Sequence, residues 1–594
     1  MTDIGPVSPR ESRDLGEREK YRQRRRRGSP REEIGRDDKI STNIDEAYEL
    51  VPELGAGRRW YDPPYRLLRW MSSGWRRKIQ PRALLTLWNR GTNFLIPFNE
   101  HHRDFTWPLD DWMHNVRVPA DEHVTVAGLW LVELFPPTEL PALERAIARN
   151  GWDKRRPFTL EEEGNREALT RARSGGGSTW WRVASLVRKG SSWFVPDGIH
   201  TDLPPMFEAV ELKAIQVGDG LTAVVSEFHL SAAAASSLDK EWHAPHEPFM
   251  RFPRGTRPQN YDRHWGAFWK VQTARSSLHG EARSWLASRV PGYFGRRHVP
   301  QPLLDLLLLD KLDPTRAEPA NISRDTSVHR SNALRALALD SHSPYLLISD
   351  ALPKMLLATT SPALHKAMGE VPTWTLWGKR DAIVKAMGKD PLAGYGGEAD
   401  RAIADRLVGR MQNLFVMLAA SELLTIAARE QAEVRDRAAS IHGKFRPKAL
   451  RELRRSFLTL SLDLASMQRD VKRFWQRPWY WEGDAKFFYT LTAREQRADR
   501  EVGRKAKDPI EFNSSVRERQ EELFSSLIDS DRDLRDILST VASLGASADS
   551  FKLGRSALVV AIVSLIVAVG TILMADISDT SILGSLLDAV RALW

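Results

Sequence analysis

The feature that most constrains this chain is an uncharged apolar run of 19 residues, from Ser556 to Met574. At a rise of about 1.5 Å per residue, a helix of this length crosses the roughly 30 Å hydrocarbon core of a bilayer. A helix pairs its own backbone groups, so it can cross lipid alone. A buried core helix is the alternative, but uncharged runs of this length are rare in soluble folds. The sequence therefore predicts a single membrane-spanning helix.

The charges beside this run predict its orientation. Lys552 and Arg555 precede it, and Asp576 and Asp579 follow it. The positive-inside tendency places the preceding residues in the cytoplasm, and Lys552 and Arg555 become candidates for contact with anionic lipid. The polar residues 1–38 contain no apolar export core. We expect a single-pass protein of the cell (inner) membrane, with its N-terminus and bulk cytoplasmic and a short C-terminus outside.

Apolar heptads precede the predicted membrane helix. One seam runs from Leu450 to Phe474 and a second from Val516 to Phe551. Gln520 and Ser530 are polar residues at seam positions, where they can set helix register or oligomeric state. Heptads serve a homo-oligomeric stalk and an intramolecular bundle equally well, and both remain open.

A chain of 594 residues is too long to fold around one ordinary hydrophobic core, so several structural units are expected. The predicted fold class is an α+β cytoplasmic region, followed by a long helical (coiled-coil-like) stalk and one C-terminal transmembrane helix. The expected units are a disordered basic tail (1–50), an α+β domain with a ferredoxin-like arrangement as one option (51–238), a mixed helical Trp-rich region (239–397), an antiparallel helical hairpin (398–476), a polar linker (477–509), a stalk helix (510–555), the transmembrane helix (556–574) and an amphipathic segment (575–594).

The α+β domain rests on local patterns. Val124 to Phe135 predicts a strand, and Pro136-Pro137 ends it before a helix. Two further apolar runs flank Gly218-Asp219-Gly220, which is a hairpin signal. Trp374 to Trp377 suggests another strand. A module of this kind is suited to binding a ligand or a protein.

Composition narrows the chemistry. The chain has no cysteine, which excludes disulfides, thiolate metal sites and cysteine nucleophiles. The formal net charge is +10, which favours anionic partners. The run Arg24, Arg25, Arg26 and Arg27 could contact anionic lipid or form a solvated tail. Basic and aromatic residues also interleave from Arg69 to Arg77, where an interfacial or core-edge segment is favoured over nucleic-acid stacking.

Two groups of side chains could hold a metal ion. His243 and His246 are three residues apart, although Pro245 between them disfavours a regular helix. The second group combines imidazoles and carboxylates in one polar stretch: His101, His102, Asp104, Asp110, Asp111 and His114. The sequence contains no nucleophile elbow, phosphate-binding loop or dinucleotide fingerprint, so it names no catalytic residue or cofactor.

From Glu398 to Met574 the predicted architecture resembles the CorA-type magnesium transporter family. The resemblance lies in a cytoplasmic domain, long helices and a stalk helix that runs straight into a membrane helix. That family continues from its first membrane helix into a Gly-Met-Asn motif and a second span. Here Met574 is followed by Ala575-Asp576-Ile577, and neither feature is present. The resemblance implies an oligomeric relative of ion transporters.

These patterns lead to one principal hypothesis and two alternatives. The principal hypothesis is a membrane-anchored cytoplasmic sensor or interaction protein whose helical stalk couples an α/β module to the bilayer. The alternatives are a diverged CorA-like ion-transport relative that acts as an oligomer, and a membrane-tethered enzyme. Expected partners are the lipid bilayer, further copies of the chain through the stalk heptads, and other proteins.

Overall fold

The computed structural model describes residues 49–108, 114–153, 164–175, 179–193, 195, 197–315, 324–339, 345–359, 373–388, 398–442, 447–492, 508–574 and 582–593. Residues 1–48 of the expected disordered tail (1–50), including the run from Arg24 to Arg27, lie outside these residues. So do Asp110 and Asp111 of the second candidate metal group.

The centre of the molecule is one mixed sheet of eleven strands, in the order β13-β12-β9-β10-β11-β8-β1-β5-β4-β2-β3. Neighbouring strands are antiparallel except for the parallel pairs β8–β11 and β2–β3. The strands are β1 (Val124–Phe135), β2 (Trp180–Arg188), β3 (Ile199–Thr201), β4 (Phe207–Gln216), β5 (Thr222–Leu230), β8 (Leu303–Leu309), β9 (Tyr345–Ile348), β10 (Met355–Thr359), β11 (Thr373–Lys379), β12 (Phe488–Leu491) and β13 (Ile510–Glu511). A separate two-stranded hairpin joins β6 (Phe249–Arg251) to β7 (Gln259–Tyr261).

Helices cover both faces of this sheet. On one face lie α11 (Tyr293–Arg296), α14 (Arg380–Met387), α15 (Ala399–His442), α16 (Pro447–Gln476) and the first part of α18 (Phe512–Met574). On the other face lie α6 (Leu140–Arg149), α7 (Asn165–Arg173), α8 (Ala232–Ala235), α9 (Ser237–His243), α10 (Arg263–Arg289) and α12 (Arg324–Ala336). The short helices η1 (Pro137–Glu139) and η3 (Pro478–Tyr480) join these elements. The sheet is therefore the middle of three layers.

The central strands show why the sheet needs two covers. In β8 all seven residues are buried, since Leu304, Leu306 and Leu308 face α15 while Leu303 and Leu307 face α10. A strand with apolar residues at every position is buried on both faces, unlike one that alternates. The same holds for most of β1, which pairs with β8 and β5.

Several predicted elements are found, but the sheet crosses the expected unit boundaries. The strand expected at Val124–Phe135 is β1, and the predicted hairpin is β4–β5. However, β1 also pairs with β8, which belongs to the expected helical region 239–397. The expected polar linker 477–509 contributes β12 to the same sheet. Residues 51–238 therefore do not close into a separate four-stranded unit.

The β4–β5 hairpin is fixed against α16 by glycines. A Cβ added to Gly220 would lie 1.9 Å from Ser466 Oγ, and one on Gly218 would lie 2.4 Å from Asp470 Cγ. This closeness lets the Asp470 carboxylate accept hydrogen bonds from the backbone N–H groups of Gly220, at 2.6 Å, and Leu221, at 2.9 Å. The glycines therefore serve helix docking as well as the turn.

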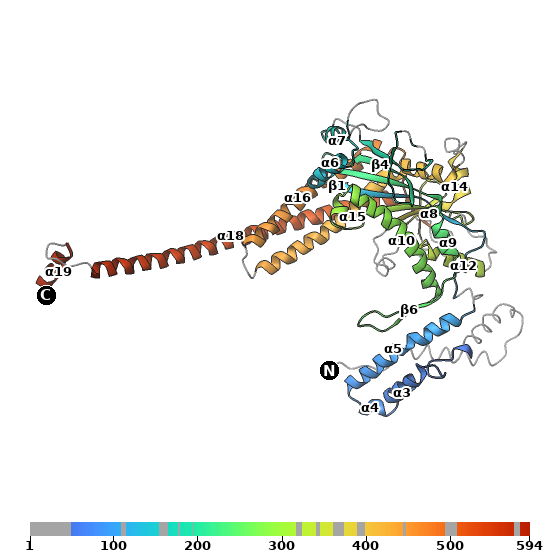
Figure 1. Ribbon diagram of the computed structural model, residues 1–594, viewed down its shortest axis with the longest axis horizontal. Helices are drawn as coiled ribbons and strands as arrows, with labels where there is room; N and C mark the ends of the chain where they lie inside the picture. The colour runs from blue at the N-terminus through green and yellow to red at the C-terminus, as the bar shows by residue number, and fades with distance from the viewer. Residues whose placement is uncertain are drawn as a thin grey trace.

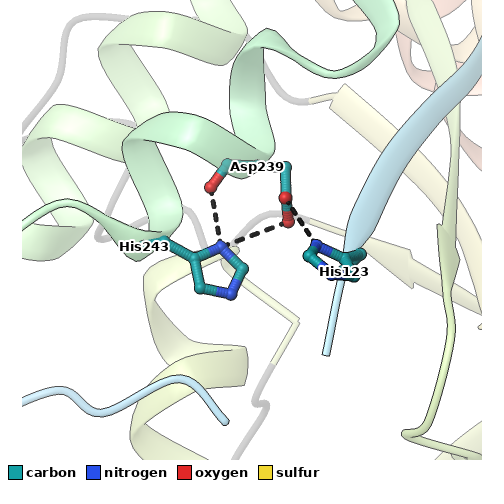
Figure 2. A group of neighbouring side chains, drawn as sticks. All are labelled: His123, Asp239 and His243. Atoms are coloured by element: carbon teal, nitrogen blue, oxygen red, sulfur yellow. Dashed lines mark hydrogen bonds and ion pairs between the residues drawn. The ribbon is translucent and has the colours of Figure 1, made fainter. Parts of the chain in front are cut away.

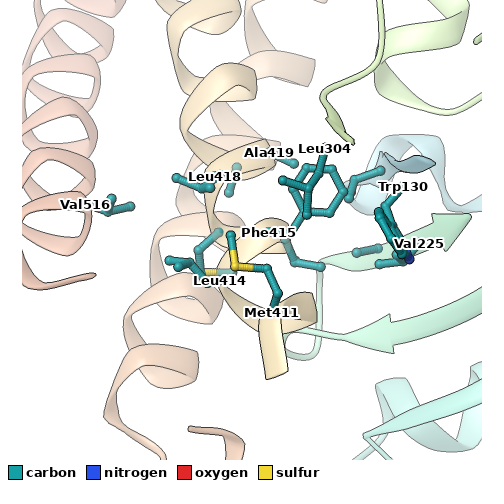
Figure 3. Packing of buried hydrophobic residues seen from close by; sticks show 14 of the residues in the cluster. Trp130, Val225, Leu304, Met411, Leu414, Phe415, Leu418, Ala419 and Val516 are labelled. Carbon is teal, nitrogen blue, oxygen red and sulfur yellow. The ribbon is translucent and has the colours of Figure 1, made fainter. Parts of the chain in front are cut away.

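The middle of helix α15, residues 414–420, is apolar on all sides because it is enclosed on all sides. Met411, Leu414, Phe415 and Leu418 are buried between the sheet and the neighbouring helices, as Figure 3 shows. Within Ala399–Arg437 the most apolar 18-residue window is apolar enough to cross a membrane, but 67% of that window is buried inside the protein. It is a core helix, as the sequence had suggested for the region around Leu414.

Helix α18 is the longest element, with 63 residues. It begins directly after the edge strand β13 and packs first against α15 and α16. It then extends away from the sheet as a lone rod towards α19 (Ile582–Ala592), which lies at the far end of the molecule (Figure 1).

Gln520 joins the three long helices. Its amide nitrogen donates to Met417 O at 2.6 Å and to Ser421 Oγ at 2.9 Å, both on α15. Its amide oxygen accepts a hydrogen bond from Trp475 Nε1 on α16 at 2.7 Å. The polar seam residue is thus fully paired within one chain.

The described seam positions also pack within the chain. Leu464, Met467 and Val471 of the first seam and Val516 and Leu527 of the second are buried in one core. The seam positions Leu450–Phe457 and Leu534–Phe551 lie outside the side chains that the structure describes. The described seam residues therefore form an intramolecular bundle, and assembly through the remaining positions stays a prediction.

A buried ionic group fastens α10 to the sheet. Asp305 on β8 receives Arg275 Nε at 2.6 Å and Arg275 Nη2 at 2.7 Å, and His279 Nε2 lies 3.1 Å away. Burial alone would raise the pKa of Asp305, but the Arg275 guanidinium and His279 hold it below its usual value. A buried pair of this kind is costly to break, because the remaining charge has no partner.

The first described part of the chain is a helical arm, residues 62–106, that projects from the body. It consists of α3 (Asp62–Ser72), the single turn α4 (Arg76–Ile79) and α5 (Arg82–Thr106) (Figure 1). The C-terminal end of α5 contacts the β6–β7 hairpin. These residues fall within the range 51–238 that the sequence had assigned to the α+β domain, and they lie outside the central sheet.

Candidate functional site

Among the residues that the structure describes, one group of side chains has the spacing of a metal centre. It comprises His123, just before β1, and Asp239 and His243 on α9, whose potential ligand atoms all lie within 4.8 Å of one another. Figure 2 shows both imidazoles turned towards the Asp239 carboxylate. We refer to these three residues as the His–Asp–His group.

Local structure positions each member. Asp239 and His243 are four residues apart and so lie on one face of α9, where His243 Nδ1 is 3.3 Å from Asp239 Oδ1. Asp239 Oδ1 also accepts a hydrogen bond from Val124 N at 2.9 Å, which holds the start of β1 against α9. His123 Nδ1 lies 2.8 Å from Asp239 Oδ2.

The His–Asp–His group is accessible and polar. His123 is exposed, and the hydrogen bond to Asp239 together with the negative charge of that carboxylate raises the pKa of His123. Two imidazoles and one carboxylate form a donor set that suits Zn²⁺ and other first-row transition metals. Three protein ligands near the surface would leave coordination positions for water.

The predicted pair of His243 and His246 is not brought together in this group. Helix α9 ends at His243, and Pro245 follows, so His246 leaves the helical face. His246 is partly buried, and burial lowers its pKa. His243 instead meets His123, which lies 120 residues earlier in the chain.

The second predicted group has other partners. His101 Nδ1 lies 3.2 Å from Asn260 Oδ1, and Asp104 Oδ2 accepts from the same amide at 2.5 Å. His102 Nδ1 lies 3.2 Å from a backbone oxygen, and His114 stacks on an indole with ring centroids 4.0 Å apart. These described residues fasten the arm and its surroundings rather than converge on one point.

A tryptophan-lined groove of about 660 Å³ lies at the root of α18. Its aromatic wall is Trp475, Trp479 and Trp481, and its charged rim includes Lys486, Glu511 and Arg517. We call it the tryptophan groove. Its volume suits a small molecule, since ligand sites commonly measure about 300–1,000 Å³.

The groove is partly preformed. Trp475 and Trp481 stack in parallel with centroids 4.3 Å apart and an interplanar angle of 1°. Trp481 Nε1 donates to Phe474 O at 3.1 Å, which fixes the second ring. Trp479 is 62% exposed and is available to cover a ligand. A flat aromatic or apolar molecule matches this surface best.

Other titratable groups lie between the sheet and α15. Burial and the neighbouring Glu211 raise the pKa of Glu227 to about 8, and burial lowers the pKa of His229 to about 4. Lys213 Nζ donates to Gln412 Oε1 on α15 at 3.2 Å. The space beside them is about 10 Å³, which is room for about one water molecule and no ligand.

The predicted membrane segment is exposed. Residues Leu553–Ile572 have a mean hydropathy of 2.2, and none of this window is buried inside the protein. Arg555 and Ser556 are exposed as well, while the side chains of Lys552 and Met574 are outside the described set. This exposed apolar segment of α18 therefore indicates association with a membrane.

The sequence had suggested neither the complete His–Asp–His group nor the groove. A signal existed for each: Asp239 and His243 have helical i, i+4 spacing, and three tryptophans occur between residues 475 and 481. Comparison with known proteins adds no assignment, because no family model, curated protein or solved structure matches the chain.

Proposed function

We propose that this protein is a membrane-anchored sensor, in which a small flat ligand binds in the tryptophan groove and helix α18 carries the response to the bilayer. One observation carries the proposal. A single continuous helix begins at the edge of the sheet, lines the groove with Asn513, Ser514 and Arg517, and ends in the exposed apolar segment.

The coupling is physically direct. Trp475 lines the groove and also donates its indole N–H to Gln520 on α18. A ligand that moves or immobilises Trp475 therefore changes a contact that fixes α18. By linkage, a change in α18 also alters the affinity of the groove by the same factor.

The membrane half of the proposal includes the sidedness. Arg555 lies before the apolar segment and Asp576 after it, so the sheet faces the cytoplasm of a single-pass protein. The test is alkaline extraction of membranes. We expect the full chain to stay in the pellet, and a chain ending at Leu553 to be soluble and folded, since none of the window Leu553–Ile572 is buried. A full chain that is extracted would refute the anchor.

The sensing half is tested with the full chain in lipid nanodiscs. The probe is 1-anilinonaphthalene-8-sulfonate, an aromatic dye with a flat naphthalene ring system. We expect it to bind and to slow amide exchange in residues 512–527 of α18. Trp479→Ala should weaken binding about fivefold, which corresponds to the ~1 kcal/mol of an aromatic pair. Trp180→Ala, which removes another exposed indole, is the control.

Two outcomes would contradict the sensing proposal. In the first, Trp479→Ala and Trp180→Ala change dye binding equally. In the second, the dye binds in the groove while exchange in α18 stays unchanged. The second outcome leaves a binding site but removes the coupling.

An oligomeric ion-transport relative is the second candidate. The α/β domain that leads into one long helix and an apolar segment favours it. Mass measurement in detergent and Mg²⁺ flux into liposomes separate the candidates. A ring with flux supports transport, and a monomer or dimer without flux supports the sensor.

A further inference from the structure

The helical arm is a folded unit attached to the body. A Cβ on Gly91 of α5 would lie 2.9 Å from Leu68 Cδ1 of α3, so the two helices touch closely. Trp88 Nε1 donates to Gln80 Oε1 at 3.0 Å and closes the connection at α4. At the other end, Arg263 of α10 donates to Phe105 O at 3.0 Å.

The arm leaves large apolar side chains exposed at its tip. Trp75 and Ile79, at α4, are 67% and 70% exposed, and Trp70 is 55% exposed. Leu67 on α3 and Leu84 and Leu87 on α5 are each at least 41% exposed as well. Several large exposed apolar side chains on one small folded unit indicate an interaction site.

The charged residues of the arm are mostly basic. Residues 63–99 contain seven Arg or Lys residues and no Asp or Glu. Arg77, Lys78 and Arg82 are exposed at the tip beside Trp75 and Ile79. The tip therefore presents indole, aliphatic and cationic groups together.

We infer that the tip of the arm binds the surface of a bilayer that contains anionic lipid. Indole rings favour the headgroup level, aliphatic side chains enter the acyl boundary, and each basic residue gains from the negative surface potential. Nucleic acid would use the charges and indoles but has no contact for Ile79, Leu84 and Leu87. A second arm would bring two cationic surfaces together.

The arm lies beside the sheet, and α4 is the end of the arm that points towards the α19 side of the molecule (Figure 1). The tip is therefore not covered by the sheet and its helices. Lipid binding by the tip is independent of the proposed function, because it depends on the exposed side chains of the arm and not on α18.

The experiment uses the full chain in nanodiscs of pure phosphatidylcholine. Vesicles that contain about 30% of the anionic lipid phosphatidylserine are added, since basic segments bind anionic lipid surfaces. Co-flotation of the protein with these vesicles is then measured. We expect binding to these vesicles and little to phosphatidylcholine vesicles. Arg77→Glu, Lys78→Glu and Arg82→Glu together should lower the partition coefficient about 100-fold or more.

Matched variants separate charge from structure. Arg145→Glu, Lys189→Glu and Lys472→Glu change the net charge equally at exposed sites on the body and should bind as the parent chain does. Trp75→Ala with Ile79→Ala should lower binding without changing its salt dependence. Circular dichroism checks that each variant is folded.

Several results would overturn the inference. They are equal binding to charged and uncharged vesicles, equal losses in the arm and body variants, or preferential capture of a DNA or RNA duplex that the arm variant abolishes. An arm-dependent dimer without vesicle binding would also overturn it. A chain that ends at Leu553 should bind the charged vesicles as the full chain does, and loss of binding in that folded chain would show that the arm does not bind lipid by itself.

Discussion

Gln520→Leu offers the sharpest test of how α18 is fixed to the body. The leucine keeps the volume near that of glutamine but cannot accept the indole N–H of Trp475 or donate to Met417 O and Ser421 Oγ. A partly buried donor left without a partner costs about 1–3 kcal/mol, and the greater apolar burial of leucine offsets about 1 kcal/mol. We expect a net loss of about 1 kcal/mol in the stability of this contact.

Amide exchange measures that loss where it occurs. A change of about 1 kcal/mol corresponds to roughly fivefold faster exchange in residues 512–527, if those amides exchange through local opening. The midpoint of guanidinium unfolding should fall as well. Gln476→Leu is the matched control, because Gln476 is exposed on α16 next to Trp475.

The expected pattern is specific. Gln520→Leu should loosen α18 while Gln476→Leu leaves exchange within about twofold of the parent chain, since surface substitutions usually change stability by less than ~0.5 kcal/mol. Equal behaviour of the two variants would show that Gln520 does not hold the helices, and the proposed route from the groove to α18 would lose its first step.

Three further predictions concern other parts of the fold. Gly220→Ala should destabilise the protein, because its Cβ would lie 1.9 Å from the neighbouring helix, whereas Gly280→Ala meets no atom within 4 Å and should stabilise α10 by about 0.5–1 kcal/mol in thermal unfolding. Burial raises the pKa of Glu133 from 4.5 to about 7, so the parent chain should lose about 3 kcal/mol of stability relative to Glu133→Gln as the pH rises from about 4.5 to 7, as followed by denaturant titration. His123→Ala and His243→Ala should each weaken Zn²⁺ binding about tenfold or more in calorimetry, and unchanged affinity would exclude the His–Asp–His group as a site.

The elements that the sequence predicted correctly are those with local causes. The strand Val124–Phe135, the β4–β5 hairpin and the long helices have turn residues or apolar periodicity within a short window. The order of strands in the sheet has no such signal. Placing β8 beside both β1 and β11 requires pairings across distant parts of the chain, which one sequence does not display.

The heptads illustrate a second limit. A repeat of apolar residues at steps of three and four indicates that a helix has one buried face. It does not indicate which other helix covers that face. At Val516 and Leu527 the cover is supplied by α15 and α16 of the same chain. The polar seam residue Gln520 has the same ambiguity, since an amide can pair within or between chains.

Each candidate site likewise combines residues that have a local sequence signal with residues that only the fold brings together. His123 joins Asp239 only through the packing of α9 against the start of β1, so sequence spacing could not have paired them. The three indoles of the tryptophan groove are close in sequence, but its other wall comes from the first turns of α18. In each case one half of the site was visible and the other half depended on the fold.

The length of α18 also determines the solution that the sheet experiences. From Phe512 to Leu553 the helix rises by about 60 Å. At physiological ionic strength the Debye length is about 8 Å, which is much shorter than this rise. The surface potential of a membrane at the far end of α18 is therefore negligible at the sheet. With α18 as the proposed membrane anchor, the proton and ion concentrations around the groove are therefore those of the bulk solution rather than those at the membrane surface.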